Sequence, residues 1–584
     1  MSGCKNKFWW VMKRKIKLYN TPKIDHIQDM IFKSCEKYDE KLALEDILNH
    51  PISKVNYRQL KENILRFGNA LRKLGLPERT HVALISDNRV QWVISYLTLM
   101  SFNYVVVPID KNLRSNEILN ILYESDSEAI IFSDNYSNLL IEKKNTLKRL
   151  TVFINMDRAS QKDNFVFMKD LIDEEAEISE STIPKIKPTE MAEIIFTSGS
   201  LGRAKGVMLS QRNLVANLQD MLSMLMMYPE DKFLSVLPMH HTYECTCGML
   251  CPLYAGSSVH YSRSLKTIAD DMLKVKPTIV LGVPLLFDKM FKKIQKAIQS
   301  DATKSKIVSK LVTLTDFAGK LGLKKLKKKI FKEIHNKFGG SIRLFIVGGA
   351  PPDPEVAKGL QGFGFGFLQG YGLTETSPIL ALNQLDNFKN DAAGLPLPGV
   401  KLKIVKPDED GIGEIYAKGE NVMLGYYKNK EKTKETFNGE WFKTGDLGFI
   451  DDDGFLHVSG RKKNVIISKN GKNVFPEEIE DALNKSPFIL ESVVYGEKDD
   501  KQSEIIAAQI VVDSEEFILY SQKNSVQINN NLIEEIIDKE IKRINKDLTP
   551  YKRIMRFHIR EHEFEKTTTK KIKRYLVMND AEIE

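Results

Sequence analysis

The sequence predicts an α/β protein: a large N-terminal domain of helix-flanked sheets with a β-rich subdomain, followed by a small α+β C-terminal domain. Three changes of pattern along the 584 residues support this fold class. Helical and short apolar patterns alternate from about residue 57, shorter β-like pieces begin at about residue 388, and a second alternation begins at about residue 476. We expect an N-terminal extension over 1–29, a large domain over 30–462 with its β-rich part over 388–458, and a small domain over 463–584.

The first of these regions alternates two helical patterns, 60–75 and 90–102, with short apolar runs. Such alternation predicts a parallel sheet with helices on its faces. Each run ends near a glycine or a turn, where α/β proteins place ligands. The predicted strands lie at 81–86, 104–109, 128–132, 191–196, 277–282 and 342–349.

The other two regions have shorter elements. In the β-rich part, turns separate the predicted strands 400–405, 413–419, 454–460 and 464–468. The C-terminal part alternates a helix over 476–486, strands over 491–496 and 505–512, and a long amphipathic helix over 530–548. The charged stretch 459–465 is the predicted boundary between the two domains.

The composition narrows the classes of partner and compartment. The net charge of +9 comes from 86 basic residues interleaved with 77 acidic ones, which does not indicate nucleic acid and fits an anionic small molecule or an anionic membrane surface. Five cysteines in a chain this long do not form a disulfide framework, so we expect a reducing compartment, the cytosol. The apolar run over 8–12 is too short for a signal peptide, and no run is long enough to span a bilayer.

A glycine-punctuated run, FTSGSLGRAKGVML at 196–209, has the residue types of a phosphate-binding loop. It is not a P-loop, because its glycines are too close together and its lysine does not follow directly. Backbone amides at glycine, hydroxyls and one ammonium suit a phosphate, and an ordinary strand-to-helix turn before the helical pattern at 210–225 is the alternative. The candidate phosphate ligands are Thr197, Ser198, Gly199, Ser200, Gly202 and Lys205.

Three further stretches carry groups that suit a nucleotide. QGYGLTETSP at 369–378 places an aromatic between two glycines and follows it with a hydroxyl and a carboxylate that suit a phosphate and its Mg²⁺. WFKTGDLGFIDDDGFLHVSGRKKNVI at 441–466 offers Asp446 to ribose hydroxyls and Arg461 to ribose or phosphate. FEKTTTKKIKRY at 564–575 is by itself a basic tail.

In this order and at these separations the four stretches resemble the adenylate-forming enzymes, and the resemblance covers about residues 30–576. It implies that the first loop binds the β- and γ-phosphates of ATP, that Thr374 contacts the α-phosphate and that Glu375 binds Mg²⁺. Asp446 is expected to bind the ribose with the help of Arg461. The adenine pocket is expected to include Gly349, Ala350, Pro351, Gly370, Tyr371 and Gly372.

The resemblance also implies a catalytic lysine and a mobile C-terminal domain. Relatives read P-K-T-x-S-G-K-I, which aligns with EKTTTKKI, so Lys571 takes the catalytic position and Lys570 stands in place of glycine. An ammonium beside the α-phosphate stabilises the charge that develops as a carboxylate attacks. Lys463 takes the hinge position, and rotation there is expected to bring the loop with Gly471 to the CoA tunnel.

Two segments resemble those of long-chain acyl-CoA synthetases. LPMHHTYECTCGMLCPL at 237–253 places His241 beside the substrate carboxylate and Glu244 three residues later. VLGVPLLFDKM at 280–290 implies an acyl pocket at Gly282, Val283 and Pro284, although Leu285 replaces the usual arginine. The resemblance implies an ATP-dependent long-chain fatty-acid:CoA ligase that forms acyl-AMP and then the acyl-CoA thioester. Its implied substrates are a fatty acid, ATP and CoA, and its implied cofactor is Mg²⁺.

Several departures leave alternatives open. Leu201 and Ala204 stand where relatives have Thr and Pro. A lost hydroxyl contact to phosphate is expected to weaken ATP binding by about 1.5–3 kcal/mol unless Ser198, Ser200 and Arg203 replace it. Transfer to an acyl carrier protein and a catalytically weakened lipid- or nucleotide-binding regulator are the alternatives to CoA ligation. A zinc site is a further hypothesis for His240, His241, Cys245, Cys247 and Cys251. The cysteine spacing lacks a second C-x₂₋₄-C pair at a fitting distance, so small buried thiols are the simpler interpretation.

The basic amphipathic pattern at 321–340 predicts a helix. Packing on its own domain is the favoured interpretation, and peripheral contact with an anionic membrane at the inner membrane face is the alternative. The N-terminal run KFWWVMKRKIK at 7–17 adds aromatic and basic residues that suit the same membrane.

Overall fold

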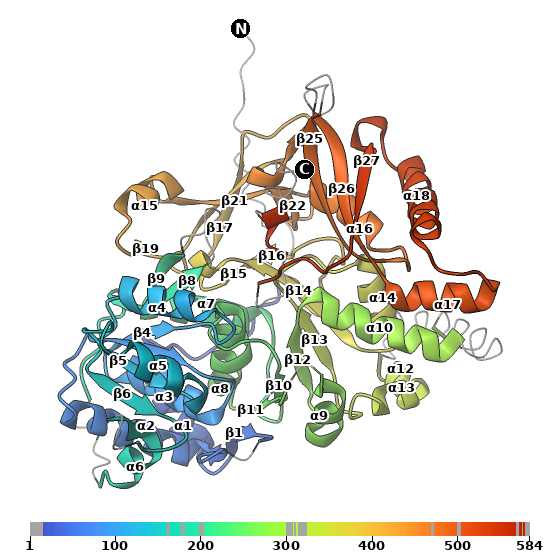
Figure 1. Cartoon of the computed structure of the whole chain (residues 1–584). Helices are drawn as coiled ribbons and strands as arrows, with labels where there is room; N and C mark the ends of the chain where they lie inside the picture. Colours follow the sequence, from blue (N-terminus) through green and yellow to red (C-terminus); the bar gives the residue numbers. More distant parts are fainter. Residues whose placement is uncertain are drawn as a thin grey trace. The chain divides into compact units, whose positions relative to one another are not determined.

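The computed structural model describes residues 16–48, 50–160, 164–176, 180, 183–197, 204–264, 266–299, 308, 311–312, 324–468, 472–498, 504–567, 572–574 and 576–577 (Figure 1). The chain divides into two compact units. The first comprises 1–402, 417–442 and 452–456, and the second comprises 403–416, 443–451 and 457–584.

A nine-stranded sheet in the first unit has the order β16-β15-β14-β13-β12-β10-β11-β1-β2. Its middle strands, from β14 to β1, are parallel, and antiparallel strands lie at both edges. The strands are β1 (Leu42–Asp46), β2 (Lys54–Asn56), β10 (Lys232–Ser235), β11 (Ser258–Tyr261), β12 (Ile279–Gly282), β13 (Leu344–Val347), β14 (Gly366–Gly372), β15 (Ile379–Leu382) and β16 (Leu395–Pro396).

An eight-stranded sheet in the same unit has the order β19-β9-β8-β4-β3-β5-β6-β7. The strands from β8 to β7 are parallel, whereas β9 is antiparallel to both β8 and β19. The strands are β3 (His81–Ile85), β4 (Val105–Pro108), β5 (Ala129–Phe132), β6 (Val152–Asn155), β7 (Val166–Phe167), β8 (Met191–Thr197), β9 (Lys205–Ser210) and β19 (Gly425–Tyr426).

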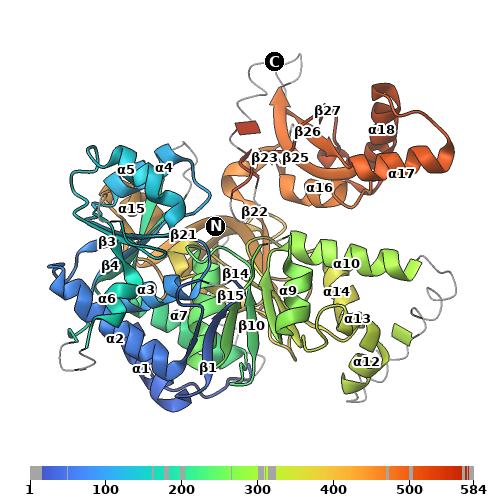
Figure 2. The ribbon, with the colours of Figure 1, turned by 60° about the horizontal axis from the view of Figure 1, so that its bottom comes forward.

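Helices cover these sheets (Figures 1 and 2). Apolar side chains of the helices and strands are buried in shared cores. Helix α3 shows why they form where they do, since every residue of VQWVISYLTLMS is buried, as expected of a helix that lies between other elements. The helices of the first unit are α1 (Ile27–Tyr38), α2 (Tyr57–Lys73), α3 (Val90–Ser101), α4 (Ser115–Glu124), α5 (Ser137–Lys143), α6 (Met168–Asp173), α7 (Gln211–Met224), α8 (Cys251–Ala255), α9 (Ile268–Val275), α10 (Pro284–Gln299), α12 (Lys324–Ile330), α13 (Lys332–Asn336), α14 (Pro354–Gly362) and α15 (Lys430–Thr436).

A further sheet has the order β17-β18-β21-β20, with β22 paired to β21. Strands β17, β18, β21 and β22 each contribute residues to both compact units. The strands are β17 (Lys401–Val405), β18 (Gly413–Lys418), β20 (Phe437–Asn438), β21 (Trp441–Ile450) and β22 (Leu456–Arg461).

The rest of the second unit is the α+β domain that the sequence predicts. Its three-stranded sheet β25-β26-β27 and helices α16 and α18 share one core that includes Ile479, Val494 and Ile537. The elements are β23 (Ile466–Ile467), β24 (Asn473–Val474), α16 (Pro476–Leu483), β25 (Ile489–Lys498), β26 (Glu504–Val512), α17 (Ser514–Asn524), α18 (Asn530–Asp547) and β27 (Arg556–Arg560).

The predicted helix over 321–340 differs from the structure. Two short helices, α12 and α13, replace it, with a break at Phe331, and 321–323 lie outside the described residues. Phe331 and Phe338 are buried in a core shared with Phe363 and Phe365. The break lets these rings pack inward, so the structure agrees with the favoured interpretation of packing on the protein itself.

Among the described residues, no helix combines the length and the apolar character that crossing a membrane requires.

Candidate functional site

The predicted phosphate loop joins two antiparallel strands, whereas the sequence predicted a strand followed by a helix. Strand β8 ends at Thr197, strand β9 begins at Lys205, and these two residues are paired across the hairpin. The extra strand forms because Val207 and Leu209 alternate into the core before α7 begins. The loop residues Ser198, Gly199, Ser200, Leu201 and Gly202 lie outside the described residues.

Lys205 lies beside two groups from distant parts of the chain. Its Nζ is 5.7 Å from the ring centroid of Tyr426, and the Tyr426 hydroxyl donates to Oε1 of Glu375 at 2.9 Å. Burial and the charge of Lys432 lower the pKa of Lys205, while Glu375 opposes that shift. Within the described part of the chain, no carboxylate lies at ion-pair distance from Lys205, so this ammonium suits an anionic ligand.

Strand β14 leads directly to Glu375. It ends at Gly372, and a short 3₁₀ turn, η4 (Thr374–Thr376), follows. A Cβ at Gly372 would lie 1.8 Å from the carbonyl oxygen of Pro378, so only glycine permits this approach of the two strands. The carbonyl of Glu375 accepts the N–H of Met423 at 2.9 Å. Five predicted nucleotide-binding residues lie on this segment and are close together in the sequence. They are Gly370, Tyr371, Gly372, Thr374 and Glu375.

The predicted adenine loop meets the predicted acyl residues at the ends of adjacent strands. Gly282 is the last residue of β12, and its carbonyl accepts the N–H of Gly348 at 3.2 Å, just after β13. The ring of Tyr243 packs against Gly348, and its hydroxyl donates to the carbonyl of Ile346 at 3.0 Å. The structure therefore brings together Gly282, Val283 and Pro284, with Pro284 opening α10, and Gly349, Ala350 and Pro351.

His241 precedes a buried π-helical segment, η3 (Tyr243–Leu250). Its Nδ1 accepts the backbone N–H of Tyr243 at 3.3 Å, and its carbonyl accepts the N–H of Cys245 at 3.0 Å. Because Nδ1 is an acceptor, the neutral imidazole carries its proton on Nε2. An Nε2–H group is the donor that a carboxylate substrate needs.

Two buried carboxyl groups lie in and beside this segment: Glu244 belongs to η3, and Glu193, on β8, interacts with Cys245 of η3. Burial raises the pKa of Glu244 to about 8 against the opposing hydrogen bond from Ser235. Burial also raises the pKa of Glu193 to about 7, against the hydrogen bond that the Tyr96 hydroxyl donates at 2.9 Å. Both groups are therefore held in an environment that disfavours a carboxylate.

The predicted ribose site lies in the second unit. Nε of Arg461 is 2.9 Å from Oδ1 of Asp446, which is buried on β21. The N–H of Asp446 donates to the hydroxyl of Thr444 at 3.1 Å, and that hydroxyl donates to the carbonyl of Ile415 at 2.8 Å. The structure thus brings Asp446 and Arg461 together and orients both from the backbone of one sheet.

Of the three remaining predicted residues, only Lys463 lies in the described part of the chain. Lys463 lies in a short 3₁₀ turn, η5 (Lys462–Asn464), immediately after β22. Lys571 and Gly471 lie outside the described residues. Tyr426 was missed by the sequence analysis, because nothing in GYYKNK indicates that its hydroxyl reaches a carboxylate 51 residues away.

The fold resembles solved adenylate-forming structures. An anthranilate CoA ligase, AuaEII, aligns with a TM-score of 0.75 at 21% identity, and the alignment covers 97% of this chain and 98% of that one. MatB from Rhodopseudomonas palustris aligns with a TM-score of 0.74 at 24% identity, over 95% and 98% of the two chains. At these identities the likeness confirms the fold class.

Sequence comparisons also extend over most of the chain. The long-chain-fatty-acid–CoA ligase FadD15 of Mycobacterium bovis is 27% identical, over 95% of each chain. The chloroplastic long-chain-fatty-acid–[acyl-carrier-protein] ligase AEE15 of Arabidopsis thaliana is 29% identical, over 81% of this chain and 74% of its own. The AMP-binding enzyme model matches residues 31–427, and the AMP-binding enzyme C-terminal domain model matches residues 478–571. The chain therefore belongs to the AMP-binding enzyme family.

Proposed function

We propose that this enzyme is an ATP-dependent long-chain fatty-acid:CoA ligase that forms acyl-AMP with release of pyrophosphate and then the acyl-CoA thioester. The observation that carries the proposal is the group around Lys205, where an ammonium without a carboxylate partner among the described residues lies near the carboxylate of Glu375. This pairing of a cation for phosphate and a carboxylate for a divalent metal fits ATP with Mg²⁺. Relatives named as fatty-acid ligases supply the substrate class.

In this proposal the residues of the site have separate binding and orienting roles. ATP supplies the activated phosphate, and Mg²⁺ neutralises part of its charge. Lys205 and the preceding stretch 197–204 are expected to bind the terminal phosphates, and Thr374 the α-phosphate. Asp446 and Arg461 are expected to hold the ribose. His241 is expected to donate from Nε2 to the fatty-acid carboxylate, which orients its attack.

The decisive experiment measures acid-dependent pyrophosphate release and thioester formation with acids from acetate to eicosanoate. We expect activity with long-chain acids and none without an acid. Absence of acid-dependent pyrophosphate with every substrate would remove the enzyme assignment. A Leu201→Thr variant is expected to lower the KM for ATP by about tenfold, since it restores a hydroxyl contact to phosphate.

The acceptor of the acyl group defines a second candidate function. A relative named as an acyl-carrier-protein ligase is 29% identical over 81% of this chain, and the net charge of +9 suits an acidic carrier protein. CoA remains the proposed acceptor. Parallel assays with CoA and with a phosphopantetheinylated carrier protein separate the two functions, because only the true acceptor accumulates thioester.

We further propose that the enzyme acts in the cytosol with peripheral contact to an anionic membrane. The segment 7–17 combines aromatic and basic side chains, which favour the membrane interface. Helices α12 and α13 are the weaker candidate because Phe331 and Phe338 pack into the protein core. Flotation with vesicles of anionic phospholipid at low salt should recover the protein, and deletion of residues 1–15 should abolish recovery.

A further inference from the structure

The loop that carries His241 is held by a side chain from the other sheet. Residues 236–242 join β10, in the nine-stranded sheet, to η3. Asn88 lies between β3 and α3, and β3 belongs to the eight-stranded sheet. Its Nδ2 donates to the carbonyl of Leu237 at 2.6 Å and to Oγ of Ser235 at 3.2 Å, and its Oδ1 accepts the N–H of Met239 at 3.2 Å.

These three bonds use both ends of the Asn88 amide. The side chains of Leu237 and Met239 are buried, so water is a poor substitute partner for their backbone groups. Ser235, which accepts from Asn88, also hydrogen-bonds Glu244. Asn88 therefore restrains the loop that precedes His241. It also contacts Ser235, the residue that hydrogen-bonds the Glu244 carboxyl group.

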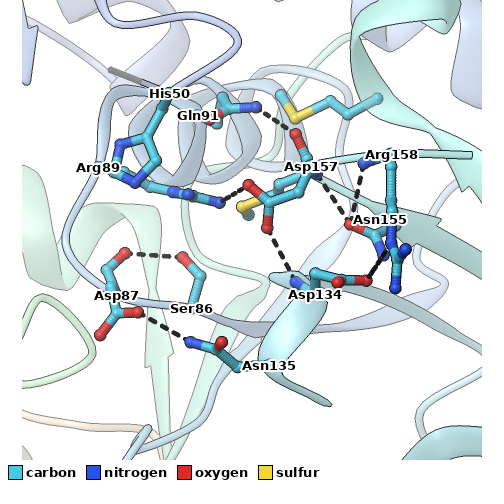
Figure 3. A network of polar contacts seen from close by, with 12 residues as sticks. His50, Ser86, Asp87, Arg89, Gln91, Asp134, Asn135, Asn155, Asp157 and Arg158 are labelled. Atoms are coloured by element: carbon cyan, nitrogen blue, oxygen red, sulfur yellow. Dashed lines mark hydrogen bonds and ion pairs between the residues drawn. The ribbon is translucent and has the colours of Figure 1, made fainter. Parts of the chain in front are cut away.

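The turn that carries Asn88 is itself fixed (Figure 3). Oδ2 of Asp87 accepts from Asn135 at 3.3 Å, and Nη1 of Arg89 is 2.9 Å from Oδ1 of Asp157. Lys111 pairs with Oδ1 of Asp87 at 2.6 Å. These partners follow β5, β6 and β4, so three neighbouring strand ends hold the residues on both sides of Asn88.

A second contact joins the same two regions. Nε2 of His240 lies 3.5 Å from Oδ2 of Asp110, which follows β4, and burial lowers the pKa of His240. This contact holds His240 beside Asp110 of the eight-stranded sheet region. Nδ1 of His241, the next residue, accepts the N–H of Tyr243. The loop is thus held at His240 by the eight-stranded sheet and at His241 by the start of η3.

We propose that Asn88 is a positioning residue for the fatty acid: by fixing the backbone of Leu237 and Met239 it sets where Nε2 of His241 meets the carboxylate. This inference rests on the proposed function, in which His241 contacts that carboxylate. Asn88 itself touches no reacting atom, so its effect is expected on the binding and alignment of the acid and not on ATP.

The test uses the full-length enzyme and acid-dependent pyrophosphate release. Asn88→Ala should raise the KM for a long-chain acid by about tenfold to a hundredfold and leave the KM for ATP within about twofold. Asn545→Ala is the matched control, because Asn545 also bonds a backbone N–H and carbonyl, both of Ile554 and both at 2.9 Å, in the second unit. That control should leave both KM values unchanged.

Two further measurements exclude a merely structural role. Asn88→Asp loses the donors as a carboxylate and regains one when protonated, so its activity relative to wild type should recover toward acidic pH, whereas Asn88→Ala should not. In a His241→Ala background, Asn88→Ala should add no further increase in the KM for the acid.

The outcomes separate this inference from the proposed function. Equal effects of Asn88→Ala on the acid and on ATP, or costs that add fully to those of His241→Ala, would overturn the positioning role while wild-type activity stands. A wild-type enzyme without acid-dependent pyrophosphate would instead overturn the function on which the role rests.

Discussion

Tyr426 connects the two charged groups of the proposed ATP site. Its hydroxyl donates to Glu375 at 2.9 Å, and its ring lies under the ammonium of Lys205. Tyr426→Phe keeps the ring and removes the donor, so the carboxylate loses a bond that fixes it for a metal. We expect the KM for ATP·Mg²⁺ to rise by about tenfold, since a hydrogen bond to a charged group contributes about 1.5–3 kcal/mol before solvent exposure reduces it.

Tyr427 provides the matched control for that change. It is the next residue, and its hydroxyl also donates to a carboxylate, that of Asp126, at 2.8 Å. Tyr427→Phe should leave the KM for ATP unchanged. Equal effects of the two variants in initial-rate assays at varied ATP and Mg²⁺ would contradict the assignment of Tyr426 to the nucleotide site.

Glu244 makes the stability of the first unit depend on pH. Its pKa is raised to about 8 by burial, from an ordinary value of 4.5, so the folded protein holds this proton more tightly than the unfolded chain does. Ionisation of this buried carboxyl group lowers the free energy of unfolding. That loss of stability is absent below about pH 4.5, grows as pH rises, and is complete above about pH 8. Glu244→Gln removes it, so the variant should gain unfolding temperature relative to wild type as pH rises from about 5 to about 8.

Thermal unfolding across that pH range checks the expectation for Glu244. Glu420→Gln is the control, because the Glu420 side chain is 66% exposed and pairs with Arg212 at the surface. Its difference from wild type should stay constant with pH. A constant difference for Glu244→Gln as well would show that the carboxyl group is not protonated in the folded protein.

The close approach of β14 to β15 is a property of these two strands as elements. A methyl group at Gly372 would lie 1.8 Å from a backbone oxygen, which cannot move aside as a side-chain tip can. Gly372→Ala should therefore destabilise the protein by about 3 kcal/mol or more and impair nucleotide binding, because η4 with Thr374 and Glu375 follows directly.

Gly362→Ala is the control at this scale. Gly362 is the last residue of α14, and its new methyl group would come no closer than 3.3 Å, to Val312. We expect less than about 1 kcal/mol of change, because alanine is the better helix former. Denaturant unfolding of both variants measures the difference, and equal destabilisation would contradict the steric explanation.

The parallel strands were predictable from the sequence because each is a short apolar run bounded by turn residues, as β3, β4, β5 and β13 show. Strand β9 was not, because its glycine-rich approach suggested a turn into the following helix. Its pairing partners lie on β8 and β19, and β19 is more than 200 residues away. The helix over 321–340 was predicted as continuous because the pattern does not reveal which rings face inward.

Some residues of the proposed site were likewise predictable from the sequence, and others were not. Local motifs predicted Thr197, Lys205, Glu375, Asp446 and Arg461, and the structure brings Lys205 near Glu375 and Asp446 next to Arg461. Tyr426 and Asn88 carry no local signal, since their partners lie 51 and up to 151 residues away. A side chain that acts across such separations is visible only once the sheets are assembled.

We propose that the predicted C-terminal domain, 463–584, is the part of the chain that moves between the two half-reactions. Arg461 ends β22, and Lys463 follows it in a short turn at the start of the predicted C-terminal domain. We propose that this turn is the hinge. Lys463→Pro fixes φ and removes a backbone donor there, so we expect adenylation to persist while thioester formation falls by about tenfold or more.

Lys571 should show the opposite selectivity. We propose that its ammonium stabilises charge at the α-phosphate, so Lys571→Ala is expected to lower acid-dependent pyrophosphate release by about a hundredfold or more. Thioester formation from supplied acyl-AMP should continue, because that substrate is already activated. Lys570→Ala is the matched control, since the neighbouring lysine stands where relatives have glycine and should be dispensable. Single-turnover measurements of each half-reaction decide the matter, and a larger loss of pyrophosphate release from Lys570→Ala would move the catalytic role to Lys570.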